Sequence, residues 1–518
     1  MKVNLKPELA KQVESVVDRI VDERICSRIA SKDSSIWGVD AQAEASIRLG
    51  WVSSPRDSLE LVAGILKLRD EFAGQGITRF VLCGMGGSSL APEVISGYFN
   101  KDLVILDSTS PDQVRLAVKD LERTAVIVSS KSGSTVETDS QKRMFEDAFQ
   151  QVGIDPLKRI VIVTDPDSPL DRASRELGYT VFNADPTVGG RYSALTAFGL
   201  VPAGLAGCDI STILNEAVMA LPKLESDDRE NPAIVLAAAL AGQSSVDKFL
   251  IEADAVPSFG DWVEQLAAES TGKNQLGVLP IAVSAAAPEF LMELTDTITV
   301  RYSNESTDVS FEGSLGELFV LWEYATAIAG WLLEINPFDQ PNVESAKIAA
   351  RKLLDSPDFS NSLDFVDRSI GVKIRGYEVS GVTVEAAMEA LLQQVGPDSY
   401  LAIHAYLPAP TYPQFQSLRE LLAERISRPV TFGWGPRFLH STGQYHKGGP
   451  KQGVFLQLTQ RIESDLVVPG RNFSFGELIS AQANGDAEVL AAHGLPVLSL
   501  QLSNPLEDLA FLRGVIGS

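Results

Sequence analysis

Four hydroxyl side chains, one lysine and one glycine follow a short apolar run at residues 125–129. The segment reads Ser130-Lys131-Ser132-Gly133-Ser134-Thr135, and a helical pattern begins just after it. Each hydroxyl can donate a hydrogen bond to a phosphate oxygen, and a glycine at a helix start adds accessible backbone amides. A helix N-cap with Glu137 in the first turn would need only one hydroxyl. The pattern therefore favours a loop that binds a monophosphate.

A glycine-rich loop lies upstream, after another apolar run at residues 79–83. It reads Gly84-Met85-Gly86-Gly87-Ser88-Ser89 and opens a helical pattern. Glycines allow the backbone to approach an anion closely. Asp107 lies at a spacing that would suit a dinucleotide site, although Ser89 replaces the third glycine of that fingerprint. By itself this loop leaves open a phosphate site contacted by Gly87 and Ser88, a dinucleotide site, or a tight turn without ligand.

Together the two loops resemble the sugar-isomerase domain, and specifically the glucose-6-phosphate isomerase family. Further segments extend the resemblance in the family's order over residues 84–347: Val188-Gly189-Gly190-Arg191-Tyr192-Ser193, Glu269-Ser270-Thr271-Gly272-Lys273, and Asn336-Pro337-Phe338-Asp339-Gln340-Pro341-Asn342-Val343-Glu344 with Lys347. The resemblance implies an aldose–ketose isomerase that interconverts glucose 6-phosphate and fructose 6-phosphate through ring opening and an enediol, with no metal or other cofactor.

Such a reaction needs a base that moves a proton between two carbons, a charge that stabilises the enediolate, and an acid–base pair that opens the ring. The resemblance implies Glu269 as the proton shuttle, Arg191 as the stabilising charge, and Lys347 with Gln340 at the ring-opening end. Each of these residues also has a plainer explanation. Glu269 could be a solvated surface glutamate, Arg191 could form an ordinary salt bridge, and Lys347 could be one of several exposed cations on its helix.

The position of the histidines departs from the family pattern. Free-standing members carry the ring-opening histidine before the Phe-Asp-Gln motif, but here no histidine precedes His404. Residues 438–444 resemble the histidine motif and follow the Phe-Asp-Gln motif, as in the isomerase half of bifunctional transaldolase–glucose-6-phosphate isomerase fusions. His440 is therefore the predicted ring-opening acid–base, with His446 as second choice. His404 is predicted to be a core residue, and His493 a helix-end residue.

Composition limits the possible partners. Lys and Arg total 44 against 68 Asp and Glu, a formal net charge of −24 over 518 residues. This charge disfavours nucleic acid and anionic membranes, so an anionic substrate needs a locally positive pocket. Three cysteines without a CxxC pair fit a reducing compartment, and neither a secretory signal nor a membrane-length apolar run is visible. We expect a cytoplasmic homodimer that binds a small sugar phosphate.

Apolar runs and amphipathic stretches alternate along most of the chain. Strands are predicted at 79–83, 103–107, 125–129, 160–164, 180–183, 248–253, 277–283, 297–301, 401–406, 453–458 and 497–502. Their continuous hydrophobicity implies burial on both faces, as in parallel sheets covered by helices. Helical segments are predicted at 1–75, 316–333, 342–354, 412–426, 475–493 and 506–514, and a polar linker at 356–363.

The predicted fold class is α/β, with two doubly wound parallel-sheet sugar-isomerase-type domains and an additional α/β C-terminal region. The predicted domains are 1–205, 206–360 and 361–518, the last completing the second and carrying His440. Other functions stay open: an isomerase of another sugar phosphate, a non-catalytic sugar-phosphate sensor, and a dinucleotide-dependent dehydrogenase, which Ser89 and the hydroxyl-rich loop disfavour.

Overall fold

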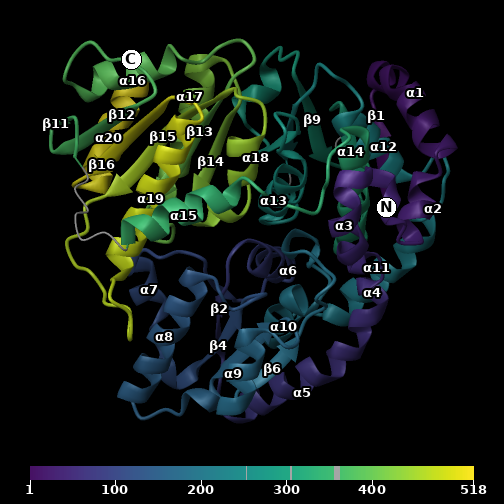
Figure 1. Ribbon diagram of the computed structural model, residues 1–518, viewed down its shortest axis with the longest axis horizontal. Coiled ribbons are helices and arrows are strands. Elements are labelled where there is room, and N and C mark those ends of the chain that lie inside the picture. Colours follow the sequence, from purple (N-terminus) through teal and green to yellow (C-terminus); the bar gives the residue numbers. More distant parts are fainter. Residues whose placement is uncertain (253, 304–305, 355–361, 518) are drawn as a thin grey trace.

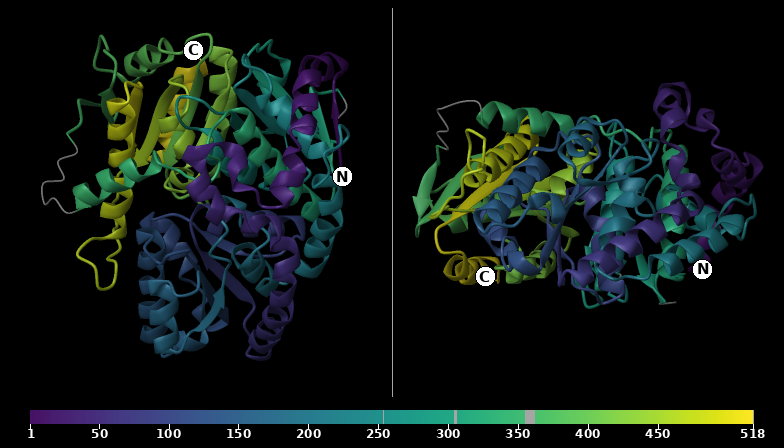
Figure 2. Two further views of the ribbon diagram at one scale, coloured as in Figure 1. Left: turned by 45° about the vertical axis from the view of Figure 1, so that its right-hand side comes forward. Right: turned by 90° about the horizontal axis from the view of Figure 1, so that it is seen from below.

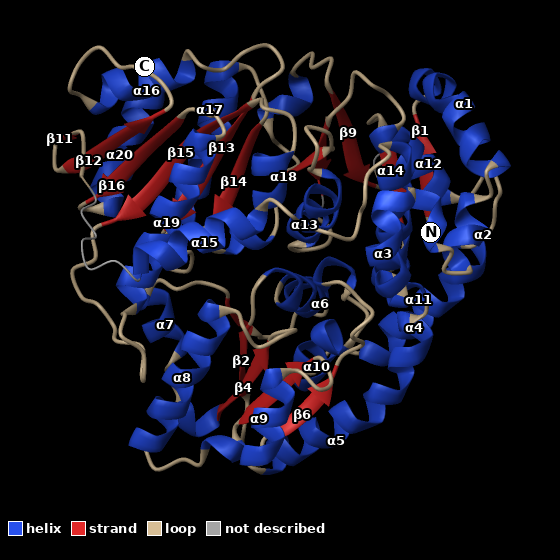
Figure 3. Ribbon diagram, viewed as in Figure 1, coloured by secondary structure: helices blue, strands red, loops and turns tan. Residues whose placement is uncertain are grey.

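Three β-sheets, each flanked by helices, make up the computed structural model, which describes residues 1–252, 254–303, 306–354 and 362–517. In Figure 1 the first sheet lies below the other two, and Figure 2 shows the same arrangement from two further sides. We refer to each sheet with its helices as the first, second or third unit. The mixed α/β character and the parallel sheets confirm the predicted fold class (Figure 3).

All five strands of the first sheet are parallel, in the order β3-β2-β4-β5-β6. Both β2 and β4 are almost wholly buried, which explains their continuous apolar sequence. The order reverses between them, because β3 lies on one side of β2 and β4 on the other. Ligands of open α/β sheets bind at the carboxyl ends of strands beside such a reversal. The strands are β2 (Arg79–Cys83), β3 (Val104–Leu106), β4 (Thr124–Ser129), β5 (Ile160–Thr164) and β6 (Thr180–Asn183).

The helices of the first unit cover both faces of this sheet (Figure 3). They are α5 (Leu61–Gly74), α6 (Leu90–Tyr98), α7 (Pro111–Ala117), α8 (Val136–Gln151), α9 (Pro169–Leu177) and α10 (Ala197–Leu205). Helices α6 and α8 follow the two loops that the sequence singled out, so their N-termini face the carboxyl ends of β2 and β4.

The second sheet has the order β1-β10-β9-β7-β8, with only β1 antiparallel. Its strands are β1 (Lys2–Leu5), β7 (Lys248–Glu252), β8 (Leu279–Val283), β9 (Thr297–Tyr302) and β10 (Val309–Glu312). The helical prediction for residues 1–75 misses β1, whose partner strand lies about three hundred residues away, and β10 was not predicted either. The associated helices are α1 (Pro7–Asp22), α2 (Ile25–Ala30), α3 (Val39–Arg48), α4 (Ser54–Asp57), α11 (Ile210–Leu224), α12 (Pro232–Ala241), α13 (Phe259–Thr271) and α14 (Leu315–Leu332).

The third sheet has the order β11-β12-β16-β15-β13-β14 and a hydrophobic core of its own. Four strands are parallel, whereas β11 and β12 add an antiparallel edge. The strands are β11 (Phe365–Asp367), β12 (Ile370–Arg375), β13 (Tyr400–Tyr406), β14 (Val430–Trp434), β15 (Gly453–Gln460) and β16 (Val497–Leu502). The helices are α15 (Val343–Leu354), α16 (Val384–Leu392), α17 (Ser417–Ile426), α18 (Gly443–Gly448), α19 (Phe475–Ala492) and α20 (Pro505–Gly517).

Every predicted strand is present, with ends shifted by two residues at most, whereas β11, β12, β14 and α16 were not predicted. Most of the predicted linker at 356–363 lies outside the described residues. The domain boundaries at 205 and 360 stay predictions. None of the helices in the described part of the chain is both long and apolar enough to cross a membrane.

Candidate functional site

A cavity of about 160 Å³ opens where the three units meet. Two short 3₁₀ helices from the first unit, Gly86–Ser88 and Gly190–Tyr192, form part of its wall, and a third, Arg437–His440, comes from the third unit. The predicted site residues that line this cavity are Gly87, Ser88, Ser130, Lys131, Thr135, Arg191, Glu269, Gln340 and His440. The hydroxyl-rich loop and the predicted catalytic glutamate therefore share one space.

Close backbone contact holds the walls together. A β-carbon placed on Gly87 would lie 2.0 Å from the carbonyl oxygen of Gly190, so the two turns can touch only without a side chain there. Gly86 has φ +55°, and a β-carbon at this position would meet the His440 carbonyl oxygen at 2.7 Å. The glycines of the first motif thus bring three turns to one point.

The hydroxyl-rich loop is organised by its own side chains. Ser130 Oγ accepts a hydrogen bond from the Gly133 amide at 3.1 Å, and Ser132 and Ser134 pair through their hydroxyls at 2.6 Å. The exposed Ser134 lines a neighbouring cavity instead, and Ser132 lines neither cavity. Two buried hydroxyls that the sequence analysis overlooked, on Ser129 and Thr138, line the first cavity and have no hydrogen-bond partner.

The ammonium group of Lys131 is held by oxygens of its own protein. Its Nζ donates to Val188 O at 2.8 Å and to Pro186 O at 3.3 Å, and it pairs with Asp165 at 2.8 Å. Burial lowers the pKa of Lys131 although Asp165 acts in the opposite direction. Lys131 therefore ties the loop to the turn preceding Arg191, and its role as a phosphate ligand stays a prediction.

Arg191 is buried and fixed on several sides. Its Nη1 donates to the carbonyl oxygens of Glu269, Pro337 and Asp339 at 3.1, 3.0 and 3.2 Å, and its Nη2 donates to Gln340 Oε1. Its Nε lies 3.4 Å from Glu269 Oε2. The guanidinium is therefore immobilised beside the carboxylate of Glu269.

Glu269 lies near the end of α13, with 12% of its side chain exposed. Gln265, one turn earlier, donates from Nε2 to Glu269 Oε2 at 3.2 Å and to the His440 carbonyl oxygen at 2.7 Å. One amide thus links the carboxylate to the histidine turn. Sequence reasoning did not select Gln265, although its i,i+4 spacing to Glu269 could have indicated it.

The imidazole of His440 contacts a buried carboxylate. Its Nε2 lies 3.1 Å from Glu137 Oε1, which also accepts a hydrogen bond from Gln482 Nε2 at 2.7 Å. Burial acts to raise the pKa of Glu137, but the hydrogen bond and charge of His440, with the charge of Lys347, outweigh it and lower this pKa. An ionised Glu137 can only accept hydrogen bonds, so Nε2 of His440 is the donor in this pair whether the ring is neutral or charged.

A second cavity of about 390 Å³ adjoins the first and shares Thr135 and His440 with it. The buried residues Glu137 and Gln482 also line it. Lys347 lines it as well; 43% of its side chain is exposed, and its Nζ lies 3.9 Å from Glu344. The structure therefore places Lys347 on the His440 side of the site and on the wall of the second cavity, with Gln340 on the wall of the first.

The other histidines lie outside both cavity linings. His446 is buried, with its Nδ1 2.9 Å from the Tyr400 hydroxyl, and burial lowers its pKa. His404 is buried 3.3 Å from Asp486, and His493 caps α19. Between the two histidines proposed for ring opening, only His440 lines the cavity with Glu269.

Lys273, within the glutamate motif, holds a turn that carries one of the site residues. Its Nζ donates to Asp339 Oδ1 and to Asp339 O, both at 2.7 Å, and so fixes the turn that carries Gln340. Burial and the charge of Arg191 lower the pKa of Lys273 to about 8. Within the described ranges, no cluster of three or more His, Cys, Asp or Glu side chains could hold a metal ion.

Comparisons with known proteins point to one family. The family model for phosphoglucose isomerase matches residues 66–275. A glucose-6-phosphate isomerase of Thermus thermophilus is 32% identical over 60% of this chain and 92% of the relative. A probable glucose-6-phosphate isomerase of Haloarcula marismortui is 28% identical over 53% of this chain and 77% of the relative.

Solved structures share the fold. A hypothetical protein of Thermus thermophilus superposes with a TM-score of 0.60 at 23% identity, covering 68% of this chain and all of that protein. A glucose-6-phosphate isomerase of Chlamydia trachomatis gives a TM-score of 0.53 at 19% identity, covering 67% and 84% of the two chains.

Proposed function

Because this chain belongs to the glucose-6-phosphate isomerase family, we propose that its central cavity interconverts glucose 6-phosphate and fructose 6-phosphate by ring opening and enediol proton transfer. The observation that carries the proposal is that the hydroxyl-rich loop, Arg191, Glu269 and His440 line one cavity. This reaction requires a phosphate-binding loop, a fixed cation, a carboxylate base and an acid–base group such as a histidine.

The phosphate group would bind between the two loops of the first sheet. Ser130 and Thr135 line the cavity from one loop, and Gly87 and Ser88 line it from the other. The unpartnered hydroxyls of Ser129 and Thr138 supply two further donors that no protein acceptor uses. Hydroxyl and backbone amide donors at a helix start suit a phosphate dianion, because the positive end of the helix dipole adds to their hydrogen bonds.

Proton transfer would use Glu269 and Arg191. The carboxylate takes the proton from one carbon and returns it to the neighbouring carbon, while the negative charge passes to the substrate oxygens. Arg191 lies beside Glu269 and is held by three carbonyl oxygens, so little reorganisation is needed when that charge develops.

Ring opening would use the His440 side of the site. Because Glu137 accepts from Nε2, a neutral His440 would have the lone pair on its other ring nitrogen, Nδ1, available to the substrate. Lys347 lines the second cavity together with His440, where its ammonium would face the ring oxygen end of the sugar. Gln340 accepts a hydrogen bond from Arg191 and lines the first cavity with Glu269 and His440.

The test is conversion of fructose 6-phosphate to glucose 6-phosphate in a coupled assay containing a chelator. We expect turnover in the wild type and a loss of about a thousandfold or more in Glu269→Gln. Glu264→Gln, on the same helix, is the matched control, because burial raises the pKa of Glu264 to about 8 and the amide mimics its protonated form. Thermal stabilisation by fructose 6-phosphate should persist in Glu269→Gln.

Other outcomes of this assay would contradict the assignment of the base or indicate a different function. Full activity in Glu269→Gln would exclude this carboxylate as the base. A wild type that is stabilised by fructose 6-phosphate without converting it would be a sugar-phosphate sensor. Faster turnover of another phosphorylated aldose would identify a different isomerase.

We also propose a homodimer located in the cytoplasm, with the domain division predicted at residues 205 and 360. Light scattering should give a mass of about twice the 55.8 kDa of one chain. A mass equal to one chain at assay concentrations would exclude the dimer.

A further inference from the structure

A chain of hydrogen bonds leads away from the imidazole of His440 into the protein. Glu137 Oε1 lies 3.1 Å from His440 Nε2 and accepts from Gln482 Nε2 at 2.7 Å. The amide oxygen of Gln482 in turn accepts from the Thr109 hydroxyl at 2.6 Å. The three supporting residues are nearly inaccessible to solvent, at 5%, 4% and 0% exposure for Glu137, Gln482 and Thr109.

The four residues alternate between two units of the protein. Thr109 follows β3 and Glu137 begins α8, both in the first unit, whereas Gln482 lies in α19 and His440 in the third unit. The chain of bonds therefore crosses the boundary between these units at each step. A small displacement of one unit against the other would change the position of the imidazole.

The orientation of the Gln482 amide follows from its two partners. The carboxylate of Glu137 can only accept, so the amide must present its nitrogen to it. The amide oxygen then points the opposite way and needs a donor, which the Thr109 hydroxyl supplies. A buried amide oxygen without this donor would carry the desolvation cost of an unpaired acceptor.

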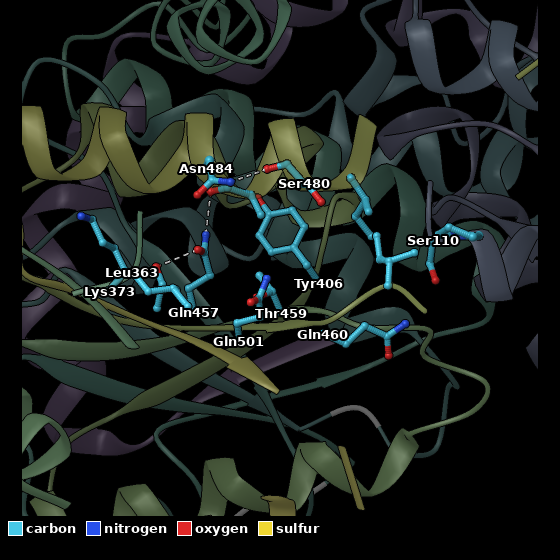
Figure 4. Close-up of a pocket in the computed structure, with 15 residues that line it drawn as sticks. Ser110, Leu363, Lys373, Tyr406, Gln457, Thr459, Gln460, Ser480, Asn484 and Gln501 are labelled. Atoms are coloured by element: carbon cyan, nitrogen blue, oxygen red, sulfur yellow. Dashed lines mark hydrogen bonds between the residues drawn. The ribbon is translucent and has the colours of Figure 1, made fainter. Parts of the chain in front are cut away.

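Helix α19 is also fixed on its other side. Gln457 of β15 donates from Nε2 to the Ala483 carbonyl oxygen at 2.8 Å, and Ser499 donates to Gln457 Oε1 at 2.9 Å. Figure 4 shows Gln457 beneath α19, with Asn484 and Ser480 above it. This hydrogen bond anchors the helix backbone beside residue 482, at the base of the Gln482 side chain.

We propose that Gln482 and Thr109 are positioning residues for the proposed isomerase: they hold the Glu137 carboxylate so that His440 keeps its proton on Nε2 and presents Nδ1 to the cavity. The inference rests on the proposed function for its catalytic consequence. Neither residue lines the cavity that holds Glu269; Gln482 lines the second cavity, and Thr109 lines neither. Their proposed effect on His440 passes through Glu137, to which Gln482 donates directly.

Loss of the Gln482 donor should raise the pKa of Glu137, because a charge-assisted hydrogen bond stabilises only the ionised form. Glu137 would then take up a proton at higher pH and release His440. Other charged groups also face this region and stay in place in the variants below. They are Lys131, Arg191, Glu269, Glu344, Lys347 and Arg351.

The first test is the pH profile of kcat for fructose 6-phosphate in Gln482→Leu. We expect the acid limb to move to higher pH by about one to two units and kcat at neutral pH to fall about tenfold. KM should stay close to wild type, because the phosphate loop is untouched. Ser480→Ala, on the opposite face of α19, is the matched control and should keep the wild-type profile.

Thr109 supplies a second, gentler test if Gln482→Leu fails to fold. Thr109→Val removes only the hydroxyl and should move the acid limb in the same direction by a smaller amount. Thr109→Ser restores the hydroxyl and should restore the profile. Rescue by serine separates a donor role from a packing role, since serine lacks the methyl group that valine keeps.

A nitrogen-15 NMR spectrum reports the His440 tautomer without any activity measurement. The chain has four histidines, and His440→Asn identifies the relevant signals. We expect protonated Nε2 and unprotonated Nδ1 in the wild type, and a mixture of tautomers in Thr109→Val and Gln482→Leu. Folded variants with an unchanged tautomer and an unchanged acid limb would overturn the inference. A wild type without isomerase activity would instead overturn the proposed function, and the NMR result would still decide the positioning role.

Discussion

Replacing Arg437 with methionine would leave a group of carboxylates without their cation. Arg437 pairs with Glu93 and lies 3.4 Å from Asp107 and 3.5 Å from Asp261. Its side chain is 15% exposed and that of Asp107 is 8% exposed, whereas Asp261 is half-exposed and contributes less. Three residues further along the chain is His440, so this cluster also fixes the histidine turn to the first unit.

The pKa of Asp107 determines how much free energy of unfolding Arg437→Met should lose. Burial raises the pKa of Asp107 to about 6 even though the charge of Arg437 lowers it. Without Arg437 the pKa should rise further, and each additional unit destabilises the ionised protein by about 1.4 kcal/mol. Two units give a loss of about 3 kcal/mol, in line with the usual cost of removing one partner of a buried ion pair.

The sign of the pH dependence provides the sharper test. A carboxyl whose folded pKa exceeds its unfolded pKa binds extra protons in the folded state, so stability falls as pH rises between the two values. At pH 5 Asp107 is largely protonated in both proteins, so the remaining loss should be only about 1 kcal/mol, from the partly exposed pair of Arg437 with Glu93. At pH 8 it should reach about 3 kcal/mol.

Urea unfolding followed by circular dichroism at pH 5 and pH 8 measures both losses. Arg471→Met is the matched control, because Arg471 pairs with Asp139 across the same two units but is 40% exposed. Its loss should stay below about 1 kcal/mol at either pH. An equal loss in Arg437→Met at both pH values would refute the reasoning, since lost packing and not charge would then be the cause.

Two further variants test the cavity walls. Lys131→Met should lower the free energy of unfolding by about 2 kcal/mol, because Asp165 loses its partner, while KM for fructose 6-phosphate rises less than about tenfold. A larger rise in KM, with unchanged stability, would make Lys131 a phosphate ligand. Gly87→Ala should reduce kcat/KM about a hundredfold by pushing two turns apart, whereas Gly189→Ala, with open space around it, should have little effect. Equal activity in the two glycine variants would contradict the close-approach argument.

The sequence was informative where burial alone decides structure. The strand β4 is buried along its whole length, so its apolar run is visible without knowledge of its neighbours. The strand β1 was missed because four residues become a strand only by pairing with β10, far along the chain. Short strands at the edge of the third sheet, such as β14, depend on neighbours in the same way.

In the candidate site too, some features could be predicted from local sequence and others depend on residues far along the chain. The motifs located the correct turns, because glycine, hydroxyl and charge patterns are local properties. Where each side chain points depends on distant partners: Lys131 turns toward Asp165 and the carbonyl oxygens near residue 187, and Glu137 meets a histidine about three hundred residues away. Gln482 left no recognisable signal in the sequence, since its role exists only once two units have docked.

The position of β16 in the third sheet has a consequence for biosynthesis. Although β16 (Val497–Leu502) is translated after the other described strands of this sheet, it lies inside the sheet between β12 and β15. Until it emerges from the ribosome, β12 and β15 both offer unsatisfied backbone groups to any neighbouring chain. A nascent polypeptide that already contains Glu269 and His440 therefore still lacks the strand that joins β12 to β15, and its open strand edges favour aggregation during this interval.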